Sequence, residues 1–471
     1  MLALNLLREE DIAPLAEGVC VTLEKVGVLC QNADLLRSLR EAGAVVDFQY
    51  ERAWFPRRMT EAFVEALRRE APAPQTEEPP VFRAPAMPGV GLQIAQFYYD
   101  YETARRRSGN RSDLITLVKF GSALHPDQGA GHALVLSDVP ASLEPLEAGL
   151  LLAEYTTKPQ PPFAWRAEQI PWLREMGEVL GLDNWFAYGA TAFAHPLRME
   201  KVVADKFVLQ VRSGAKRAGL TAMPIAGVTT PVTIGGFVVV SAAEQLATWM
   251  AARALNPAIS LGGSIWPGTV DMKTGAVSYC AFDALWYGFA TAAFLRRWCN
   301  FNIQVSGGDY CDAKFPGWFA VLEKAYKVMT LAAFTGRHGG IGSGMLEEGK
   351  TISPVQLLLE RDFTGGVRFY AGKPDFSEES LAMSAILEAG LCLDRNYLEL
   401  EHTARHFRHS LWLPEFYDRA GWAGCAHEEA MLRKAQARVR ELLASYRKPE
   451  VDPDKLEKLR AIVRRARKAL L

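Results

Sequence analysis

The chain has 471 residues, of which 49% are hydrophobic and 23% are charged, and its formal net charge is -1. This composition is that of a soluble globular protein with enough apolar residues for a large core. The near-neutral charge gives no reason to expect nucleic acid or a membrane surface as the main partner.

The sequence gives little indication of a membrane span or of a secretory signal. The most apolar run, around 229–255, carries Thr, Ser, Glu and Gln at frequent intervals, so no stretch is expected to span a bilayer. The first ten residues turn acidic too early for a secretory signal. The seven cysteines are scattered and contain no Cys-x-x-Cys pair, which favours reduced thiols. We therefore predict a cytoplasmic protein.

Residues 1–90 are predicted to form an N-terminal helical cap. Between about Glu9 and Arg69 the apolar residues recur at three- and four-residue spacing, which is typical of helices. Short extended pieces interrupt this pattern near Val45 and Trp54. Several prolines between 71 and 90 indicate a loop at the domain boundary.

Residues 91–410 are predicted to be an α/β domain, because short apolar strands alternate with helical stretches. Such an alternation favours a parallel sheet, and seven or eight units favour closure into a (β/α)8 TIM barrel. The expected strands are 131–137, 162–165, 185–191, 220–225, 257–264 and 302–307. The expected helices are 113–124, 142–156, 167–180, 197–216, 229–255, 279–298 and 315–334.

Residues 411–471 are predicted to be a C-terminal helical extension. The Lys- and Arg-rich tail after Lys448 is interpreted as a solvated helix face in preference to a contact with a partner protein. No Gly-x-Gly-x-x-Gly follows an early strand and no Walker loop is present, which argues against a dinucleotide or nucleoside triphosphate site.

Two loops after the last predicted strands carry the candidate chemistry. The first follows the strand 302–307 and exposes Asp309, Tyr310, Cys311, Asp312 and Lys314. The second, within 335–344, holds Arg337 and His338 among glycines, so its backbone must bend sharply or lie close to a bound molecule. In a barrel, both loops would reach the same mouth.

Several motifs resemble the signature of the trimethylamine methyltransferase superfamily. The most specific is Met-Pro-Ile-Ala-Gly-Val-Thr-Thr-Pro-Val-Thr-Ile-Gly-Gly at 223–236. Ser-Ala-Ala-Glu at 241–244, Val-Asp-Met-Lys-Thr-Gly at 270–275, Asp-Ala-Lys at 312–314 and His-Thr at 402–403 follow in the order and spacing of the family. The resemblance extends from about residue 8 to about residue 445.

This resemblance implies a (β/α)8 barrel that passes a methyl group from a small methylated donor to the cobalt of a separate corrinoid protein. The founding members use pyrrolysine, whereas this chain contains only the standard residues and is similar to the non-pyrrolysine branch. None of the eight histidines lies in an Asp-x-His-x-x-Gly corrinoid motif, so the cobalamin cofactor is expected on a partner. A homodimer is the expected assembly, because large barrels often pair and the N-terminal cap offers surface.

The favoured donor in this interpretation is an aryl methyl ether, as in vanillate-like O-demethylation. A cation such as Arg337 at the mouth repels a quaternary ammonium but suits a developing phenolate, which needs a hydrogen-bond donor or acid. The first alternative is a quaternary amine such as glycine betaine, which needs only an aromatic cage because it leaves as a neutral amine. A non-catalytic binder of a methylated molecule is the alternative from another class.

The roles of the candidate residues follow from their positions. His338 or Tyr310 would donate to the ether oxygen, and Arg337 or Lys314 would hold a carboxylate or phenolate. Asp309 and Asp312 complete the catalytic set, although Lys314 could simply pair with either. Cys311 is counted with the substrate-binding residues, together with the rings expected to sandwich the donor, namely Trp165, Tyr188, Trp266 and Trp318.

A bound zinc is a weaker hypothesis. His402 and His406 are four residues apart on a predicted helix, and Cys311 lies beside Asp309 and Asp312. Zinc could act as a Lewis acid on the donor, but the spacing places no third ligand with the histidine pair. The expected metal content is therefore none.

Overall fold

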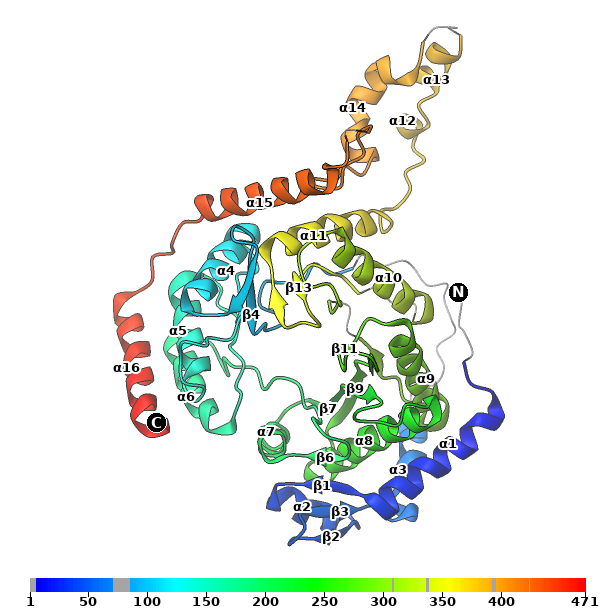
Figure 1. Cartoon of the computed structure of the whole chain (residues 1–471), viewed down its shortest axis with the longest axis vertical. Helices are drawn as coiled ribbons and strands as arrows, with labels where there is room; N and C mark the ends of the chain where they lie inside the picture. The colour runs from blue at the N-terminus through cyan, green and yellow to red at the C-terminus, as the bar shows by residue number, and fades with distance from the viewer. Residues whose placement is uncertain (1–5, 71–84, 307–308, 336–338, 392–394, 423) are drawn as a thin grey trace.

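The computed structural model describes residues 6–70, 85–306, 309–335, 339–391, 395–422 and 424–471. It shows a mixed α/β fold in which helices α4 to α11 follow one another in chain order around the outside of short strands (Figure 1). The N-terminal region lies at one side of this ring of helices. A helical arm and α15 (His427–Ser445) lie at the opposite side, whereas α16 (Pro453–Leu470) lies along another side, next to α5 and α6.

The N-terminal region contains strands as well as the predicted helices. The short extended pieces expected near Val45 and Trp54 are β2 and β3, and β1 pairs antiparallel with β3. On its other edge β1 pairs parallel with β6 (Arg198–Met199), which joins this region to the ring. Its elements are α1 (Glu9–Val21), η1 (Thr22–Val26), β1 (Val28–Cys30), α2 (Ala33–Glu41), β2 (Val45–Asp47), β3 (Arg52–Trp54) and α3 (Arg57–Glu70).

The ring helices confirm the predicted helical segments, with ends shifted by up to about five residues. Local signals account for several starts: Asn110 accepts a hydrogen bond from the Asp113 N–H at the start of α4, and Ser353 caps α11 in the same way. The helices are α4 (Arg111–Leu124), α5 (Glu144–Tyr155), η2 (Ala167–Gln169), α6 (Ile170–Leu180), α7 (Lys201–Arg212), α8 (Ile234–Leu255), α9 (Phe282–Cys299), α10 (Trp318–Thr335) and α11 (Pro354–Phe369).

The strands of the ring are short. β9 lies between β7 and β12, and both pairings are parallel. The strands are β4 (Phe97–Asp100), β5 (Arg105–Ser108), β7 (Arg217–Ala222), β8 (Ile225–Ala226), β9 (Ser260–Ile265), β10 (Gly268–Val270), β11 (Val277–Ser278), β12 (Gln304–Val305), β13 (Met345–Leu346) and β14 (Thr351–Ile352).

Three predicted strands, 131–137, 162–165 and 185–191, are present only as extended segments joined by isolated parallel bridges. Pro159, Pro161 and Pro162 lie along the middle segment and have no N–H to donate, so a continuous ladder cannot form there. Neighbouring extended segments nevertheless run parallel and follow one another in chain order. The successive pairings are Thr351↔Phe97, Ala95↔Leu134, Ala130↔Pro159 and Phe163↔Ala187. The Thr221 N–H then donates to the Thr191 carbonyl, and β7, β9 and β12 complete the series.

One described helix, α8, is long and apolar enough to cross a membrane by length and composition. Most of it is buried, because it packs against α1, α2, α9 and β7. Trp249 at its centre is fully buried and donates its indole N–H to the Gly262 carbonyl at 2.7 Å. α8 is therefore a core helix, which agrees with the sequence prediction for 229–255.

The segment after α11 leaves the ring and forms a projecting arm, which we define as residues 370–391 and 395–422 (Figure 1). The barrel was predicted to extend to residue 410, but α12 to α14 lie outside the ring, since helical periodicity does not tell where a helix packs. The later helices α15 and α16 return to pack on α4, α11, α5 and α6. The elements are α12 (Glu378–Leu381), α13 (Met383–Gly390), η3 (Tyr397–Glu399), α14 (Glu401–Ser410), α15 (His427–Ser445) and α16 (Pro453–Leu470).

Candidate active site

The loop after β12 lies against the turn that joins β13 to β14. The Glu348 N–H donates to the Cys311 carbonyl at 2.8 Å, and the Glu347 N–H donates to the Ala313 carbonyl at 3.0 Å. Both glutamates have left-handed backbones, with φ of 58° and 50°. A non-glycine residue adopts this conformation only where its surroundings impose it, as they commonly do at functional sites. The turn thereby holds the Glu348 side chain beside Asp312.

Asp312 and Glu348 form a hydrogen-bonded carboxyl pair. Ser278 Oγ donates to Asp312 Oδ2 at 2.8 Å, and the Tyr279 N–H donates to Glu348 Oε2 at 2.9 Å. Burial alone would raise the pKa of Asp312, but the hydrogen bonds from Glu348 and Ser278 hold it below its usual value. Burial and the bond to Asp312 raise the pKa of Glu348 to about 8. At neutral pH the pair therefore holds one proton, which lies on Glu348.

Three further titratable groups surround this pair. Cys280, Asp312 and Glu323 place their ligand atoms within 4.8 Å of one another. Glu323 accepts the Ala313 N–H at 2.9 Å, and burial raises its pKa. Lys327 is fully buried and donates to the Tyr310 carbonyl at 3.3 Å. The buried part of the site thus contains three carboxyl groups and one amine.

The metal hypothesis changes with this geometry. Cys280, and not Cys311, lies with the acids, and burial raises the pKa of the Cys280 thiol so that it stays protonated. Zinc binds thiolates, so a zinc ion at this place would have to displace the thiol proton. Cys311 is fully buried and its Sγ faces the Met345 carbonyl at 3.5 Å. His402 and His406 stack on each other in the arm, with ring centroids 4.5 Å apart.

Three aromatic rings meet beside the carboxyl groups. The Tyr310 ring lies edge-on to Trp266, at 5.0 Å and 74°, and to Tyr279, at 5.7 Å and 66°. Burial raises the pKa of both tyrosines to about 12, so both phenols are neutral. The faces of these rings are electron-rich and their edges are electron-poor, so a cation would be held by a ring face.

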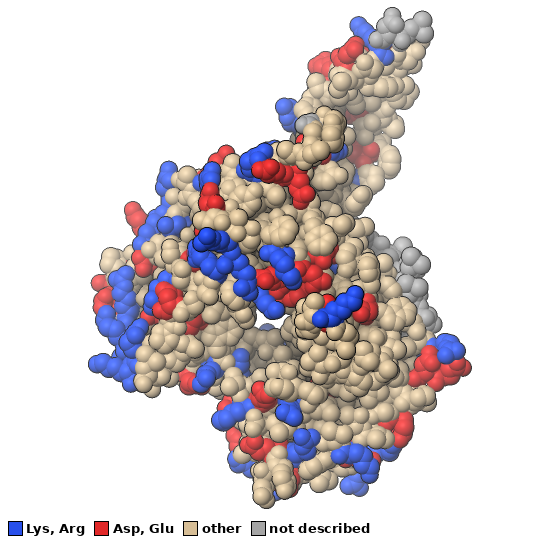
Figure 2. Space-filling view, in the orientation of Figure 1, with Lys and Arg blue, Asp and Glu red and all other residues tan. Residues whose placement is uncertain are grey.

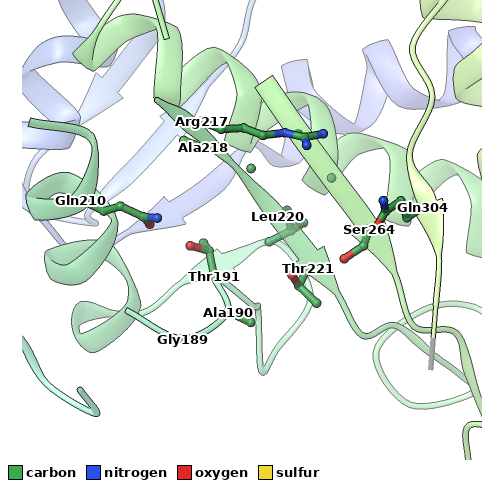
Figure 3. Close-up of a pocket in the computed structure, with 13 residues that line it drawn as sticks. Gly189, Ala190, Thr191, Gln210, Arg217, Ala218, Leu220, Thr221, Ser264 and Gln304 are labelled. Atoms are coloured by element: carbon green, nitrogen blue, oxygen red, sulfur yellow. The ribbon is translucent and has the colours of Figure 1, made fainter. Parts of the chain in front are cut away.

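A polar cavity of about 290 Å³ lies along the same strands (Figure 3). It is lined by residues of β7 and β9, among them Arg217, Thr221 and Ser264, and by Gln304 of β12, whereas Trp266, Tyr279 and Tyr310 are not among its lining residues. Arg217 extends across Gly262, which has no Cβ to block it. The space-filling view shows a hollow at the centre of the ring, with charged side chains of both signs along its upper edge (Figure 2).

Asp309 belongs to a second buried network and not to the carboxyl pair. It accepts the Ser343 hydroxyl at 2.7 Å and the Gly342 N–H at 3.2 Å. Nearby, Lys324 forms a fully buried ion pair with Glu360. Asp309 thus ties the segment after β12 to the segment before β13, which is a structural role in this arrangement.

Some of the other predicted site residues lie with the carboxyl pair and the three rings, and the rest lie elsewhere. Tyr310, Asp312 and Trp266 come together as expected. Lys314 is exposed next to Asp312. Arg337 and His338 lie outside the described residues.

Three of the predicted sandwiching rings are elsewhere. Trp165 donates its indole N–H to Glu144 at 2.6 Å, and Glu144 also bonds the fully buried His132 at 2.8 Å. Tyr188 lies edge-on to Phe186 at 5.0 Å. Trp318 packs edge-on to Tyr417 where the arm begins, at 5.7 Å. None of these contacts brings a ring to Tyr310.

Sequence reasoning missed Tyr279, Cys280, Glu323, Lys327 and Glu348. One signal was available: a lysine such as Lys327 in the middle of an apolar helix needs a buried partner. The sequence Glu-Glu-Gly at 347–349, between two short apolar strands, also marks a turn that presents acids. Neither signal indicates that Glu348 meets Asp312, since that contact is purely tertiary.

Comparison with known proteins places the chain in a family. The trimethylamine methyltransferase family matches residues 1–470. A glycine betaine methyltransferase of Desulfitobacterium hafniense is 22% identical over 480 residues, which cover 98% of this chain and 96% of that protein. A trimethylamine methyltransferase of Methanosarcina barkeri is 29% identical over 281 residues, covering 58% of this chain and 54% of that protein. A trimethylamine methyltransferase of Desulfitobacterium hafniense is 22% identical over 484 residues, with 97% and 92% covered. The chain therefore belongs to the trimethylamine methyltransferase family of corrinoid-dependent methyltransferases.

Proposed function

We propose that this enzyme takes a methyl group from a quaternary ammonium compound of the glycine betaine type and passes it to the cobalt of a separate corrinoid protein. The observation that carries the proposal is the group of three rings, Trp266, Tyr279 and Tyr310, beside three carboxyl groups. Family membership supplies the reaction class, because enzymes of this family methylate a partner corrinoid protein.

The charge at the site favours a cationic donor. The faces of aromatic rings attract a quaternary ammonium, which cannot donate a hydrogen bond and so gains little from polar partners. Asp312 stays ionised and supplies the negative charge beside the rings, whereas Glu348 holds the proton of the pair and is neutral, and burial also raises the pKa of Glu323. Lys327 is a buried amine beside the same groups. Burial lowers the pKa of Lys327, which weakens its repulsion of a cation.

The chemistry of the leaving group agrees with this arrangement. A quaternary ammonium leaves as a neutral amine, so no general acid is needed. The proton on Glu348 can remain in its bond to Asp312 throughout the reaction. The task of the protein is then to hold the donor with one methyl group directed toward the visiting cobalt, in line with the bond that breaks.

The comparisons support this donor class over the aryl methyl ether favoured from the sequence. Two relatives match nearly the full chain, a glycine betaine methyltransferase and a trimethylamine methyltransferase, and both are named for small methylated amines. The ether interpretation depended on Arg337 and His338, which lie outside the described residues.

We also propose that the extended segments and helices α4 to α11 form a (β/α)8 barrel. Parallel neighbours follow the chain order from β14 to β12, and Asp309 joins the last two segments through its bonds to Ser343 and Gly342. Trp266 and Tyr310 both come after the carboxyl ends of their strands, where the active sites of such barrels lie. The corrinoid protein would approach that end.

A donor panel tests the proposal. The purified chain is mixed with its cognate corrinoid protein in the cobalt(I) state and with glycine betaine, trimethylamine or a vanillate-like ether, and the loss of cobalt(I) absorbance is followed. We expect methyl transfer from a quaternary ammonium. Transfer from the ether alone would overturn the proposal, and thermal stabilisation by a donor without methyl transfer would indicate a binder.

Variants of Tyr310 link the result to the site. Tyr310→Leu should lower kcat/KM for the ammonium donor about 10-fold or more, because a cation–π contact is worth about 1–2 kcal/mol when desolvated. Tyr310→Phe keeps the ring and should stay within about threefold of the wild type. Tyr50→Leu, at an exposed ring in the N-terminal region, serves as the control. Equal activity of Tyr310→Leu and wild type would remove the aromatic cage from the mechanism.

A further inference from the structure

The arm exposes an unusually large apolar surface. Fourteen of the 32 exposed large hydrophobic side chains of the described residues lie between Phe369 and Trp422. Leu391, Leu398 and Trp422 are each more than 80% exposed. A monomer in water rarely leaves such a patch uncovered, so the arm is expected to have a partner.

The helix α13 turns its larger apolar residues outward. Its inner face consists of the small residues Ala385 and Ala389, which pack against Leu400. Its outer face carries the larger residues Met383, Ile386, Leu387 and Leu391, at the three- and four-residue spacing of one helical stripe. A surface helix normally turns its large apolar residues toward its own core. Here they point away, which is the pattern of a helix that packs against another chain.

The base of the arm is firmly held, so the outer face is presented in a defined place. Asp362 on α11 accepts three backbone N–H groups, from Glu415, Phe416 and Tyr417, at 2.8–2.9 Å. Trp412 packs over Gly366, where a Cβ would lie 2.9 Å from its ring. An arm anchored in this way loses little freedom when it binds a partner.

We propose that this outer face pairs with the same face of a second copy of the chain, so that two arms cross about a twofold axis. An apolar stripe complements itself in such an isologous contact, because each chain presents the same residues to the other. The charge beside the stripe, Glu388, is already paired with Arg395 within the arm, so pairing brings no unpaired like charges together.

The available area and the position of the arm both fit a second copy. The five exposed aromatic residues of the arm, Tyr370, Phe376, Tyr397, Tyr417 and Trp422, offer on the order of 600 Å², and the aliphatic stripe adds to this. A standard interface needs about 800 Å² from each partner. The arm points outward from the ring (Figure 1), away from the central site that a corrinoid protein must reach.

The test is the mass of the full chain in solution, measured by light scattering after size exclusion. We expect wild type to run at twice the chain mass of 52.1 kDa. The double variant Leu387→Glu with Leu391→Glu should run as a monomer, with the dissociation constant raised about 100-fold or more. Both side chains are exposed in the single chain, so the circular dichroism of the folded variant should stay unchanged, and Tm should fall only by the stabilisation that dimerisation provides.

A matched control places the same charges elsewhere. Leu92→Glu with Met272→Glu changes two exposed apolar residues outside the arm and should leave the dimer intact. A monomeric wild type, or an arm variant that remains dimeric, would overturn the proposal. So would loss of methyl transfer with an unchanged mass in the arm variant, since the arm would then serve the corrinoid protein. The proposal does not depend on the identity of the donor.

Discussion

Gly349 lies directly against the ring of Tyr310: a Cβ at position 349 would be 2.1 Å from Cε1 of that ring. The glycine also has a φ of 79°, which L side chains rarely adopt. The turn that carries Glu348 toward Asp312 therefore sets the position of Tyr310 as well. One short segment supports both the carboxyl pair and the aromatic group.

We predict that Gly349→Ala lowers kcat/KM for the methyl donor about 10-fold or more, because the added methyl group displaces the Tyr310 ring. The matched control is Gly275→Ala, which has a similar φ of 71° but nothing within 4 Å of the added Cβ. Both variants bear the backbone strain of about 1 kcal/mol, so both should lose similar stability from that source. The activity of Gly349→Ala should be lower than that of Gly275→Ala. Equal activity of the two variants would show that the contact between position 349 and the Tyr310 ring does not matter for methyl transfer.

The carboxyl pair predicts a difference between two substitutions of Glu348. Glu348→Ala removes the donor that faces Asp312 and leaves a buried carboxylate with fewer hydrogen bonds, which should cost about 1–3 kcal/mol in urea unfolding. Glu348→Gln keeps an N–H donor and should cost less than half as much. If the two variants unfold at the same urea concentration, the proton does not lie on Glu348.

Because of the buried Glu244, we predict that the free energy of unfolding depends on pH. Burial raises its pKa to about 8, although its Oε1 accepts the Leu197 N–H at 2.8 Å. The native state therefore keeps a proton that the unfolded state releases near the ordinary pKa of 4.5. Its contribution to stability is complete below pH 4.5 and is lost as the pH rises toward 8, by up to about 1.4 kcal/mol per pH unit.

The measurement compares the free energy of unfolding of wild type and Glu244→Gln between pH 5 and pH 8. The amide keeps an acceptor for the Leu197 N–H but does not titrate. We expect the variant to gain stability relative to wild type as the pH rises. A constant difference across this range would show that Glu244 titrates normally.

The buried ion pair of Lys324 and Glu360 gives the largest predicted loss of stability. Both side chains have no exposed surface, and Glu360 also accepts the Gly344 N–H at 3.0 Å. Lys324→Met leaves the carboxyl group unpaired and should cost about 3–5 kcal/mol. Adding Glu360→Gln should restore part of this loss. Arg405→Met, which breaks an exposed pair with Glu401, should change unfolding little; a similar loss in both single variants would argue against a special buried pair.

The sequence by itself determined the order of the helices and the residues that follow each strand. The spacing of apolar residues predicted α4 to α10, and the loop after 302–307 pointed to Tyr310 and Asp312. These are local properties, since periodicity and turn residues act over a few positions along the chain.

Only the tertiary structure decided which side chains meet. Glu348 joins Asp312 from 36 residues away, and Tyr279 reaches Tyr310 from another strand, through contacts that no spacing encodes. Trp165 and Trp318 looked like site residues by the same criteria as Trp266, yet they pack with Glu144 and Tyr417. The local pattern sets the element and face of a side chain, whereas the packing of distant elements sets its neighbours.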